Sequence, residues 1–448
     1  MERRRFFRKS RLVYLGIVVL VVLLNVAAWN SSAFADWYIA HVFPIWVSTY
    51  GRISRLFPFS VGEWLIVAGL VVAGVAALLG IIWAGIGVVW VIRHMARRLC
   101  RDTKTPGLPR RKAMELSDTE ISESSRGGGM GLSGGGDRTG SGKLRIFRRF
   151  SRGFYRFFVW VLACVSLIMT LNCFILYHAS TFSEHYFGED DNVYELGELI
   201  GVYNMVAEQC NRLSGIMDRD EGGMVVYSGS LGKDGSLLDM EDMARELMAQ
   251  LGEAYEQLDG YYPRPKALLS SDFMCQQHMQ GYYFPFSMEA NYNDVMHILN
   301  FPSTMCHELA HLRGYIYEDE ANFIGYLACV QSEDAFFQYA GYLSVLVYLH
   351  NDIYRAQKEN EAVYAETVAR IQPVKVEAQV WTDNVFVVQE EWDRINGKAL
   401  IDTEVVDRAA DVFIDTNLKV NGISDGAVSY SRVVKLLLQY YRYHPLAA

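Results

Sequence analysis

Three long runs of apolar, uncharged residues lie near the start of the chain, at 12–29, 64–92 and 157–177. An α-helix needs roughly 20 apolar residues to cross about 30 Å of hydrocarbon. Each run therefore predicts a transmembrane helix, and residues 1–177 form a predicted membrane region with the lipid bilayer as its partner.

From residue 183 onward, apolar positions recur three and four apart, which is typical of amphipathic helices in a folded domain. The predicted helices cover 193–213, 240–258, 303–313, 318–331, 335–350, a charged stretch at 352–396, and 428–441. Two segments, 267–270 and 281–293, look extended, and Pro285 makes the second an edge strand. Residues 183–448 are therefore predicted to form a helix-rich α+β domain with a small sheet.

Two connecting segments differ in composition from their surroundings. Residues 117–142 are polar and rich in Gly and Ser, which predicts a linker without a core. Residues 30–63 are aromatic and amphipathic, which suits a segment at the membrane surface. Ala33-Phe34-Ala35 resembles a signal-peptide cleavage site, but the first apolar run is longer than the about 7–15 apolar residues of a signal peptide. This length favours an uncleaved helix.

Basic residues predict the orientation in the membrane. They are frequent before the first apolar run and across 93–156, but only Arg52 and Arg55 lie between the first two runs. The positive-inside rule therefore places the N-terminus and 93–156 in the cytoplasm and the domain after residue 177 outside.

The charge of the chain is uneven, with an overall net charge of −9. Beyond residue 177 there are 18 basic and 42 acidic residues, a net charge of −24. Such a domain repels phosphate backbones, so no nucleic acid is expected as a partner.

An HExxH motif is formed by His307, Glu308 and His311. Residues four apart share one face of a helix, so two imidazoles can bind one metal ion while Glu308 lies beside it. Zn²⁺ held in this way lowers the pKa of its water towards about 7. The motif predicts a zinc site with Glu308 as general base, on a helix that begins at an N-cap, Ser303, and ends at Gly314.

A catalytic zinc ion needs a third protein ligand, and carboxylates at 318–320 begin the next predicted helix. The stretch from Glu318 to Asn322 resembles the Glu-x-x-Ala-Asp/Asn element of gluzincin-type metallopeptidases. The resemblance implies that Glu318 is the third ligand and that Asn322 steadies a histidine ligand. Glu320 remains the alternative, because the geometry of the short preceding turn is not given by the sequence.

The segments 281–293, 306–314 and 318–329 together resemble a family of bacterial membrane proteins of unknown function, recognised by an HExxH arrangement after N-terminal spans. The likeness includes 57–63 and Ser429-Tyr430, but not the Gly/Ser-rich linker. It implies a zincin-like extracytoplasmic domain on a bacterial cytoplasmic membrane and a zinc peptidase without a known substrate.

In peptidases of this broad class, an edge strand beside the HExxH helix binds extended substrate through backbone hydrogen bonds. The segment 281–293 is the candidate strand, with Tyr282, Phe284 and Phe286 able to line a cleft. Tyr430 and Tyr315 are candidate donors to the oxyanion of the transition state.

We therefore expect a membrane-anchored, zinc-dependent peptidase that acts on peptide or protein substrates at the outer membrane–water boundary. The alternative is a non-catalytic zinc-binding membrane module with a sensing or scaffolding role. A structural zinc ion would require a fourth protein ligand, and the sequence offers no obvious His or Cys for it at a suitable spacing.

Overall fold

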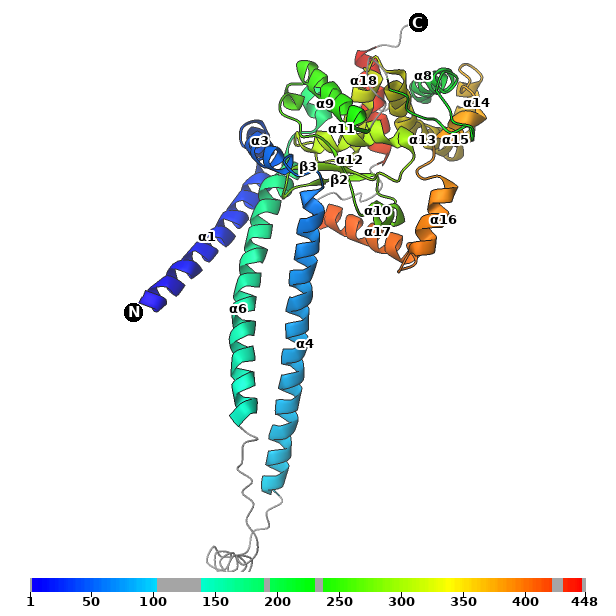
Figure 1. The fold of residues 1–448 in the computed structure, drawn as a ribbon. Helices are drawn as coiled ribbons and strands as arrows, with labels where there is room; N and C mark the ends of the chain where they lie inside the picture. The colour runs from blue at the N-terminus through cyan, green and yellow to red at the C-terminus, as the bar shows by residue number, and fades with distance from the viewer. Residues whose placement is uncertain (1, 103–137, 189–193, 230–236, 421–429, 445–448) are drawn as a thin grey trace, which may run out of the picture. The chain divides into compact units, whose positions relative to one another are not determined.

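The computed structural model describes residues 2–102, 138–188, 194–229, 237–420 and 430–444 of the chain. Most of them are helical and there is a small sheet, as predicted; the sheet has three strands (Figure 1). The predicted linker at 117–142 falls mostly outside the described residues. The contacts divide the chain into two compact units, which are Met1–Leu65 with Cys164–Ala448, and Ile66–Ala163.

Among the described residues, three helices are long and apolar enough to cross a membrane, in agreement with the three apolar runs. They are α1 (Glu2–Asn30), α4 (Val61–Asp102) and α6 (Arg138–Met169), and a π-helical turn extends the third over Thr170–Phe174. In the most apolar windows of α1 and α4, only 6% of the residues are buried inside the protein. Their side chains are therefore available to face lipid along nearly the whole length.

Within the unit Ile66–Ala163, the second and third of these helices contact one another. The Tyr155 hydroxyl donates a hydrogen bond to the Ala76 carbonyl oxygen (2.8 Å), and the rings of Trp83 and Phe147 lie 5.7 Å apart.

Two helices between the first two candidate spans belong to the folded core. Ser31 caps α2 (Ser32–His41) by accepting from the Phe34 amide, and α3 (Phe43–Ser54) follows directly. One face of this pair is buried: the Ile39 side chain lies where a Cβ at Gly314 would be, and Gly51 faces the Met288 carbonyl oxygen. The aromatic segment predicted to lie at the membrane surface therefore also packs, through one face, against the folded domain.

The sheet has the order β1-β3-β2, and its strands are β1 (Lys266–Ala267), β2 (Gly281–Phe284) and β3 (Glu289–Tyr292). β3 pairs in parallel with β1 and antiparallel with β2, so β2 is an edge strand. The prediction of one strand over 281–293 is wrong, because Pro285 begins a turn that folds the segment into a hairpin. Proline cannot donate to a ladder, and the turn also holds Met288 at a φ of 52°.

The buried Glu289 carboxylate fixes this sheet to the first residues of α4. It accepts hydrogen bonds from the amides of Val61 (3.2 Å) and Gly62 (2.8 Å), from the Ser287 hydroxyl, and from Lys266 Nζ (2.6 Å). Free amides and the helix dipole make a helix N-terminus a favourable place for a carboxylate. The beginning of the second candidate span is thus bonded to the central strand.

The predicted helices of the domain are present, except that the charged stretch at 352–396 is divided among several helices with a non-helical segment at 369–377. The largest ones are α8 (Leu196–Ser214), α9 (Leu237–Ala254), α11 (Phe301–His311), α12 (Glu318–Val330), α13 (Ala335–Glu359) and α18 (Tyr430–Tyr443). The shorter or peripheral ones are α7 (Phe182–Tyr186), α10 (Ser271–Gln276), α14 (Glu361–Val368), α15 (Ala378–Asp383), α16 (Gln389–Lys398) and α17 (Thr403–Val420).

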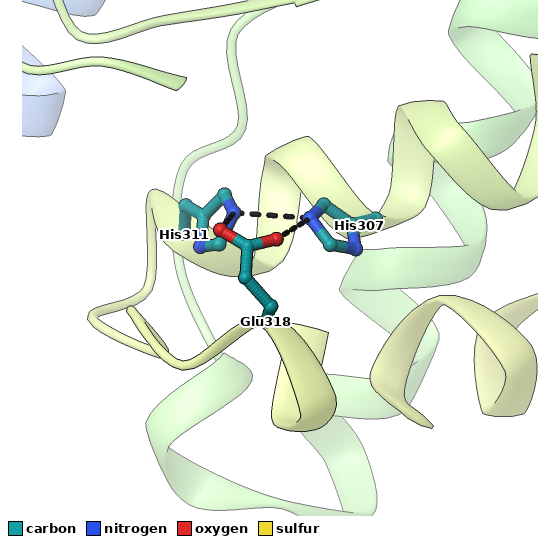
Figure 2. Close-up of side chains that lie close together, drawn as sticks. All are labelled: His307, His311 and Glu318. Atoms are coloured by element: carbon teal, nitrogen blue, oxygen red, sulfur yellow. Dashed lines mark hydrogen bonds and ion pairs between the residues drawn. The ribbon is translucent and has the colours of Figure 1, made fainter. Parts of the chain in front are cut away.

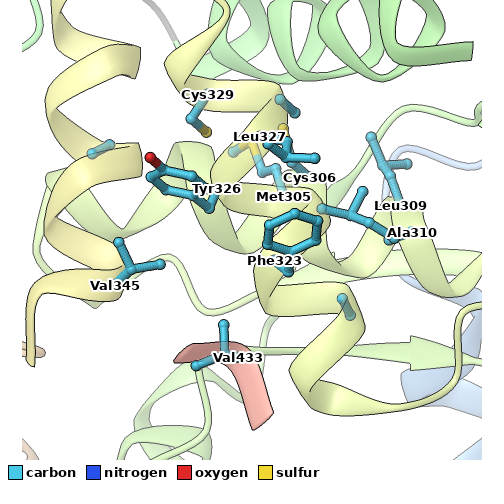
Figure 3. Packing of buried hydrophobic residues seen from close by; sticks show 14 of the residues in the cluster. Met305, Cys306, Leu309, Ala310, Phe323, Tyr326, Leu327, Cys329, Val345 and Val433 are labelled. Atoms are coloured by element: carbon cyan, nitrogen blue, oxygen red, sulfur yellow. The ribbon is translucent and has the colours of Figure 1, made fainter. Parts of the chain in front are cut away.

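The core lies where α12 packs against α11, α13 and α18 (Figure 3). Met305, Cys306 and Leu309 from α11 meet Phe323 and Leu327 from α12, and all five are fully buried. The two helices approach closely at Gly325, where a Cβ would come within 2.8 Å of the Ser303 carbonyl oxygen. A side chain there would push apart the two helices that carry the HExxH motif and the acidic segment after it.

A second buried carboxylate, Asp383, holds α15 against the core. It accepts hydrogen bonds from the Arg219 guanidinium (2.7 and 2.8 Å), Ser214 Oγ (2.9 Å), the Tyr339 hydroxyl (2.7 Å) and Gln379 Nε2 (3.0 Å). Burial disfavours the charge, but these donors outweigh it and lower the pKa of Asp383 to about 2 from its ordinary 3.8.

This shift makes the stability of the domain depend on acid pH. A folded-state pKa below the unfolded one stabilises the protein above about pH 4, by about 2 kcal/mol, and the contribution is lost as pH falls from about 4 to 2. Asp383→Asn should remove this step from thermal unfolding curves measured between pH 6 and pH 2. The exposed Asp393→Asn is the matched control, and an equal effect of the two variants would contradict the assignment.

Candidate metal centre

The HExxH motif lies on α11, with its two histidines on one side of the helix (Figure 2). The helix begins at Phe301, two residues before the predicted start, because a 3-10 turn over Ile298–Asn300 leads into it and Pro302 fits the first helical turn. Its predicted end is confirmed: regular helix stops at His311, and Gly314 turns the chain with a φ of 92°.

The next helix brings a carboxylate to the two histidines. Glu318 is the first residue of α12, and its Oε2 lies 3.0 Å from His307 Nε2. Its Oε1 lies 3.8 Å from His311 Nε2, and the two Nε2 atoms are 3.1 Å apart (Figure 2). Glu320 is not part of this cluster, because its buried carboxylate accepts the Phe182 amide (2.5 Å) instead. Of the two carboxylates considered from the sequence, the structure brings Glu318 to the histidines.

The outer ring nitrogens determine which atoms point into the cluster. His311 Nδ1 donates to the Tyr315 carbonyl oxygen (2.7 Å), and His307 Nδ1 donates to Asn322 Oδ1 (2.9 Å). In the neutral imidazole, both Nε2 atoms then carry a lone pair. Two nitrogen lone pairs and a carboxylate therefore converge, and all three are acceptors.

Electrostatics differ between the two histidines. Burial lowers the pKa of His311 to about 4, so this ring is neutral at pH 7. Burial acts in the same direction on His307, but the Glu318 carboxylate outweighs it and raises the pKa of His307 to about 9. In the protein alone, a proton thus occupies the gap between His307 and Glu318. A cation at this position would compete with that proton.

Glu308 lies beside the cluster in a buried position. Its Oε1 is 4.0 Å from His307 Nε2, and its Oε2 has no hydrogen-bond partner among the described residues. Burial raises the pKa of Glu308 to about 8. The first residue of β2 covers this carboxylate, because a Cβ at Gly281 would come within 2.8 Å of Glu308 Oε1.

The side chains of β2 alternate between two faces of the sheet. Gly281 and Tyr283 face α11, and the Tyr283 ring lies 6.1 Å from the His311 ring. Phe284 packs against Gly62 on the opposite face, which Tyr282 shares by alternation. Tyr282 and Phe284, expected to line a cleft at the motif, therefore point away from α11.

Phe286 lies in the hairpin turn rather than in the strand, with its ring 5.4 Å from that of Phe284. Tyr283 is the aromatic residue of β2 that sequence reasoning missed. The signal was available, because Tyr283 is two residues from Gly281 and so shares its face.

The two tyrosines proposed as oxyanion donors have different outcomes. The Tyr315 ring is buried in an aromatic cluster, 5.6 Å from the Phe182 ring, so this residue reaches the site through its carbonyl oxygen. Tyr430 begins α18, but its side chain lies outside the described residues.

Comparison with known proteins matches residues 142–438 to the family described as Protein of unknown function (DUF3810). The matched region covers more than half of the chain and contains the whole cluster. The chain belongs to this family. No curated protein and no solved structure matches it.

In this DUF3810 member, the close fit between β2 and α11 is directly testable. Gly281→Ala would place a Cβ 2.6 Å from the Asn291 carbonyl oxygen as well as against Glu308. Overpacking of this kind costs about 1–3 kcal/mol, so the midpoint of thermal unfolding of the detergent-solubilised chain should fall.

The matched control is Gly201→Ala in α8, where no heavy atom lies within 4 Å of the added Cβ. It should leave the midpoint unchanged or raise it slightly, because alanine favours helix. Equal unfolding midpoints for Gly281→Ala and the unsubstituted chain would contradict the close approach.

Proposed function

We propose that this chain is a membrane-anchored, zinc-dependent peptidase. The observation that supports it best is the convergence of His307 Nε2, His311 Nε2 and the Glu318 carboxylate, three acceptors within 4.8 Å of one another. Acceptors do not attract one another, so the arrangement calls for a cation or a proton between them.

The donor set fits zinc better than a harder cation. Two imidazole nitrogens and one carboxylate oxygen are the set found in catalytic zinc sites that keep a fourth position open, whereas magnesium and calcium prefer oxygen ligands. Bound zinc supplies a Lewis acid that polarises a carbonyl group and acidifies water. Among the described residues, the metal-ligating group contains no fourth His, Cys, Asp or Glu. This absence favours a catalytic role over a structural one.

The surrounding residues have distinct roles in this proposal. Asn322 and the Tyr315 carbonyl oxygen hold the two imidazoles in the tautomer that binds a metal. Glu308 takes a proton from the attacking water at its unpartnered oxygen and delivers it to the leaving amine. Its position in a buried environment suits this task, because a general base works best with a pKa near the operating pH.

A peptide substrate would bind along β2. This strand is at the edge of the sheet, so one side of its backbone has no partner strand among the described residues. An extended peptide can add to such an edge through backbone hydrogen bonds. The carbonyl group to be cut would then lie near Gly281, beside Glu308.

A zincin-like fold and an extracytoplasmic position in a bacterial cytoplasmic membrane are parts of the same proposal. The HExxH helix followed by an acidic helix supports the first. The positive-inside distribution of Arg and Lys and the resemblance to bacterial membrane proteins support the second.

Metal analysis tests the ligand set. The full-length chain, purified in detergent, should contain about one zinc ion per chain by elemental mass spectrometry. Glu318→Gln should lose most of this zinc, because a neutral amide binds the metal far more weakly than a carboxylate. Glu320→Gln is the matched control and should keep it. Loss of zinc from Glu320→Gln alone would assign the third ligand to Glu320 and contradict the geometry.

The role of Glu308 is tested with a mixed-sequence peptide library and mass spectrometry of the products. Glu308→Gln should keep its zinc but lower the cleavage rate by about 10²–10⁴-fold, the usual contribution of a general base. His307→Ala should lose the metal and the activity together. Unchanged turnover in Glu308→Gln would exclude this mechanism.

A further inference from the structure

We infer that the substrate is a polypeptide anchored in the same membrane as the enzyme, cut within a few residues of the bilayer surface. The inference rests on the proposed peptidase function and adds the class of substrate. It follows from hydrogen bonds that join neighbours of the metal-binding cluster to the end of the third candidate span, which in turn contacts the end of the first.

The end of the third candidate span, Leu144–His178, contacts the site at two points. The Tyr317 hydroxyl, from the residue before Glu318, donates to the Tyr177 carbonyl oxygen (2.7 Å). The Tyr283 hydroxyl donates to the Asn172 carbonyl oxygen (3.0 Å), while its ring lies beside His311. Tyr317 therefore joins the span to the residue next to Glu318, and Tyr283 joins it to the surroundings of His311.

The hairpin that covers Glu308 is bonded to the same place. Asn172 Nδ2 donates to the Pro285 carbonyl oxygen in the turn between β2 and β3 (2.7 Å). The end of the edge strand that would bind substrate is therefore bonded to the last turns of the span. A peptide added to this edge would lie next to the end of a membrane helix.

The end of the first candidate span, Lys9–Asn30, contacts the end of the third. Asn25 Nδ2 donates to Thr170 Oγ1 (2.9 Å), and the rings of Trp29 and His178 are 4.8 Å apart. Beyond the span, the Asp36 carboxylate accepts hydrogen bonds from the Ser180 amide (2.7 Å) and hydroxyl (2.8 Å). The ends of the first and third candidate spans are therefore joined to one another next to the site.

An exposed apolar surface lies on the same segment of chain. It consists of Trp37, Ile45, Ile53, Leu56, Phe57 and Trp64, and its exposure ranges from 42% for Phe57 to 79% for Leu56. The opposite face of α2 and α3 is buried under the hairpin and Gly314. Because candidate spans lead into and out of this segment, we assign the exposed face to the headgroup region of the bilayer, where Trp and aliphatic residues are favoured.

These contacts hold the cluster close to the membrane surface. An extended chain covers about 3.3–3.6 Å per residue, so an anchored polypeptide needs only a few residues beyond its own span to reach β2. A segment held far above the bilayer could not reach the same strand. Membrane anchoring also keeps enzyme and substrate at high effective concentration.

The experiment uses the full-length chain in lipid vesicles and a mixed-sequence library of short peptides in three forms. The first form is joined directly to a single transmembrane helix. The second is joined to the same helix through a 30-residue helical spacer, which holds it about 45 Å above the surface. The third form is free in solution. Cleavage that depends on Glu308 is measured by mass spectrometry against Glu308→Gln.

We expect the directly anchored library to be cut at least about tenfold faster than either of the other two, with cut sites within about ten residues of the helix. The two anchored forms share the same transmembrane helix, so confinement to the membrane alone cannot produce a difference between them. Equal cutting of both anchored forms, or of the free form, would overturn the inference and leave the peptidase standing. Absence of Glu308-dependent cutting in all three forms would overturn the peptidase function and this inference with it.

Discussion

The arrangement of the site depends on one electrostatic constraint, which is that three acceptor atoms from two helices point into one small volume. His307 and His311 are fixed by the helical period, but Glu318 must come from a separate helix across a short turn. Glu318 is the first residue of α12, and a helix N-terminus stabilises the negative charge of its carboxylate. The close packing of α11 on α12 at Gly325 then sets the separation of the two helices that carry these side chains. The apolar core thus holds the two imidazoles and the carboxylate in one small volume.

Buried carboxylates also connect the domain to the candidate spans. Glu289 bonds the central strand to the first turn of α4, and Glu63 in that turn accepts hydrogen bonds from the amides of Leu269 and Ser270. The hairpin that covers Glu308 is therefore bonded to the start of one candidate span and, through Asn172, to the end of another. Membrane anchoring and site geometry share these residues, so the site cannot be treated as a soluble domain that merely carries an anchor.

The sequence predicted the parts of this structure that depend on local periodicity. Three apolar helices and the face shared by His307 and His311 follow from residue spacing alone. The choice between Glu318 and Glu320 did not, because residues two apart on a helix face nearly opposite directions and the preceding turn decides which one reaches the histidines. The hairpin at Pro285 and the orientation of Tyr283 were also missed, since a shift of one residue exchanges the faces of a strand. Likewise, the amphipathic pattern of α2 and α3 showed two faces but not that one of them packs on Gly314.

The treatment of buried carboxylates separates the site from the rest of the domain. Asp383 and Glu289 each accept four or more hydrogen bonds, which is the rule for buried charge. Glu308 is as buried as these two, yet one of its oxygens has no partner among the described residues. Glu308 thus lacks the donors that Asp383 and Glu289 have, although its Oε1 lies only 4.0 Å from His307 Nε2. In the proposed peptidase, the missing donors leave this carboxylate able to accept a proton from water.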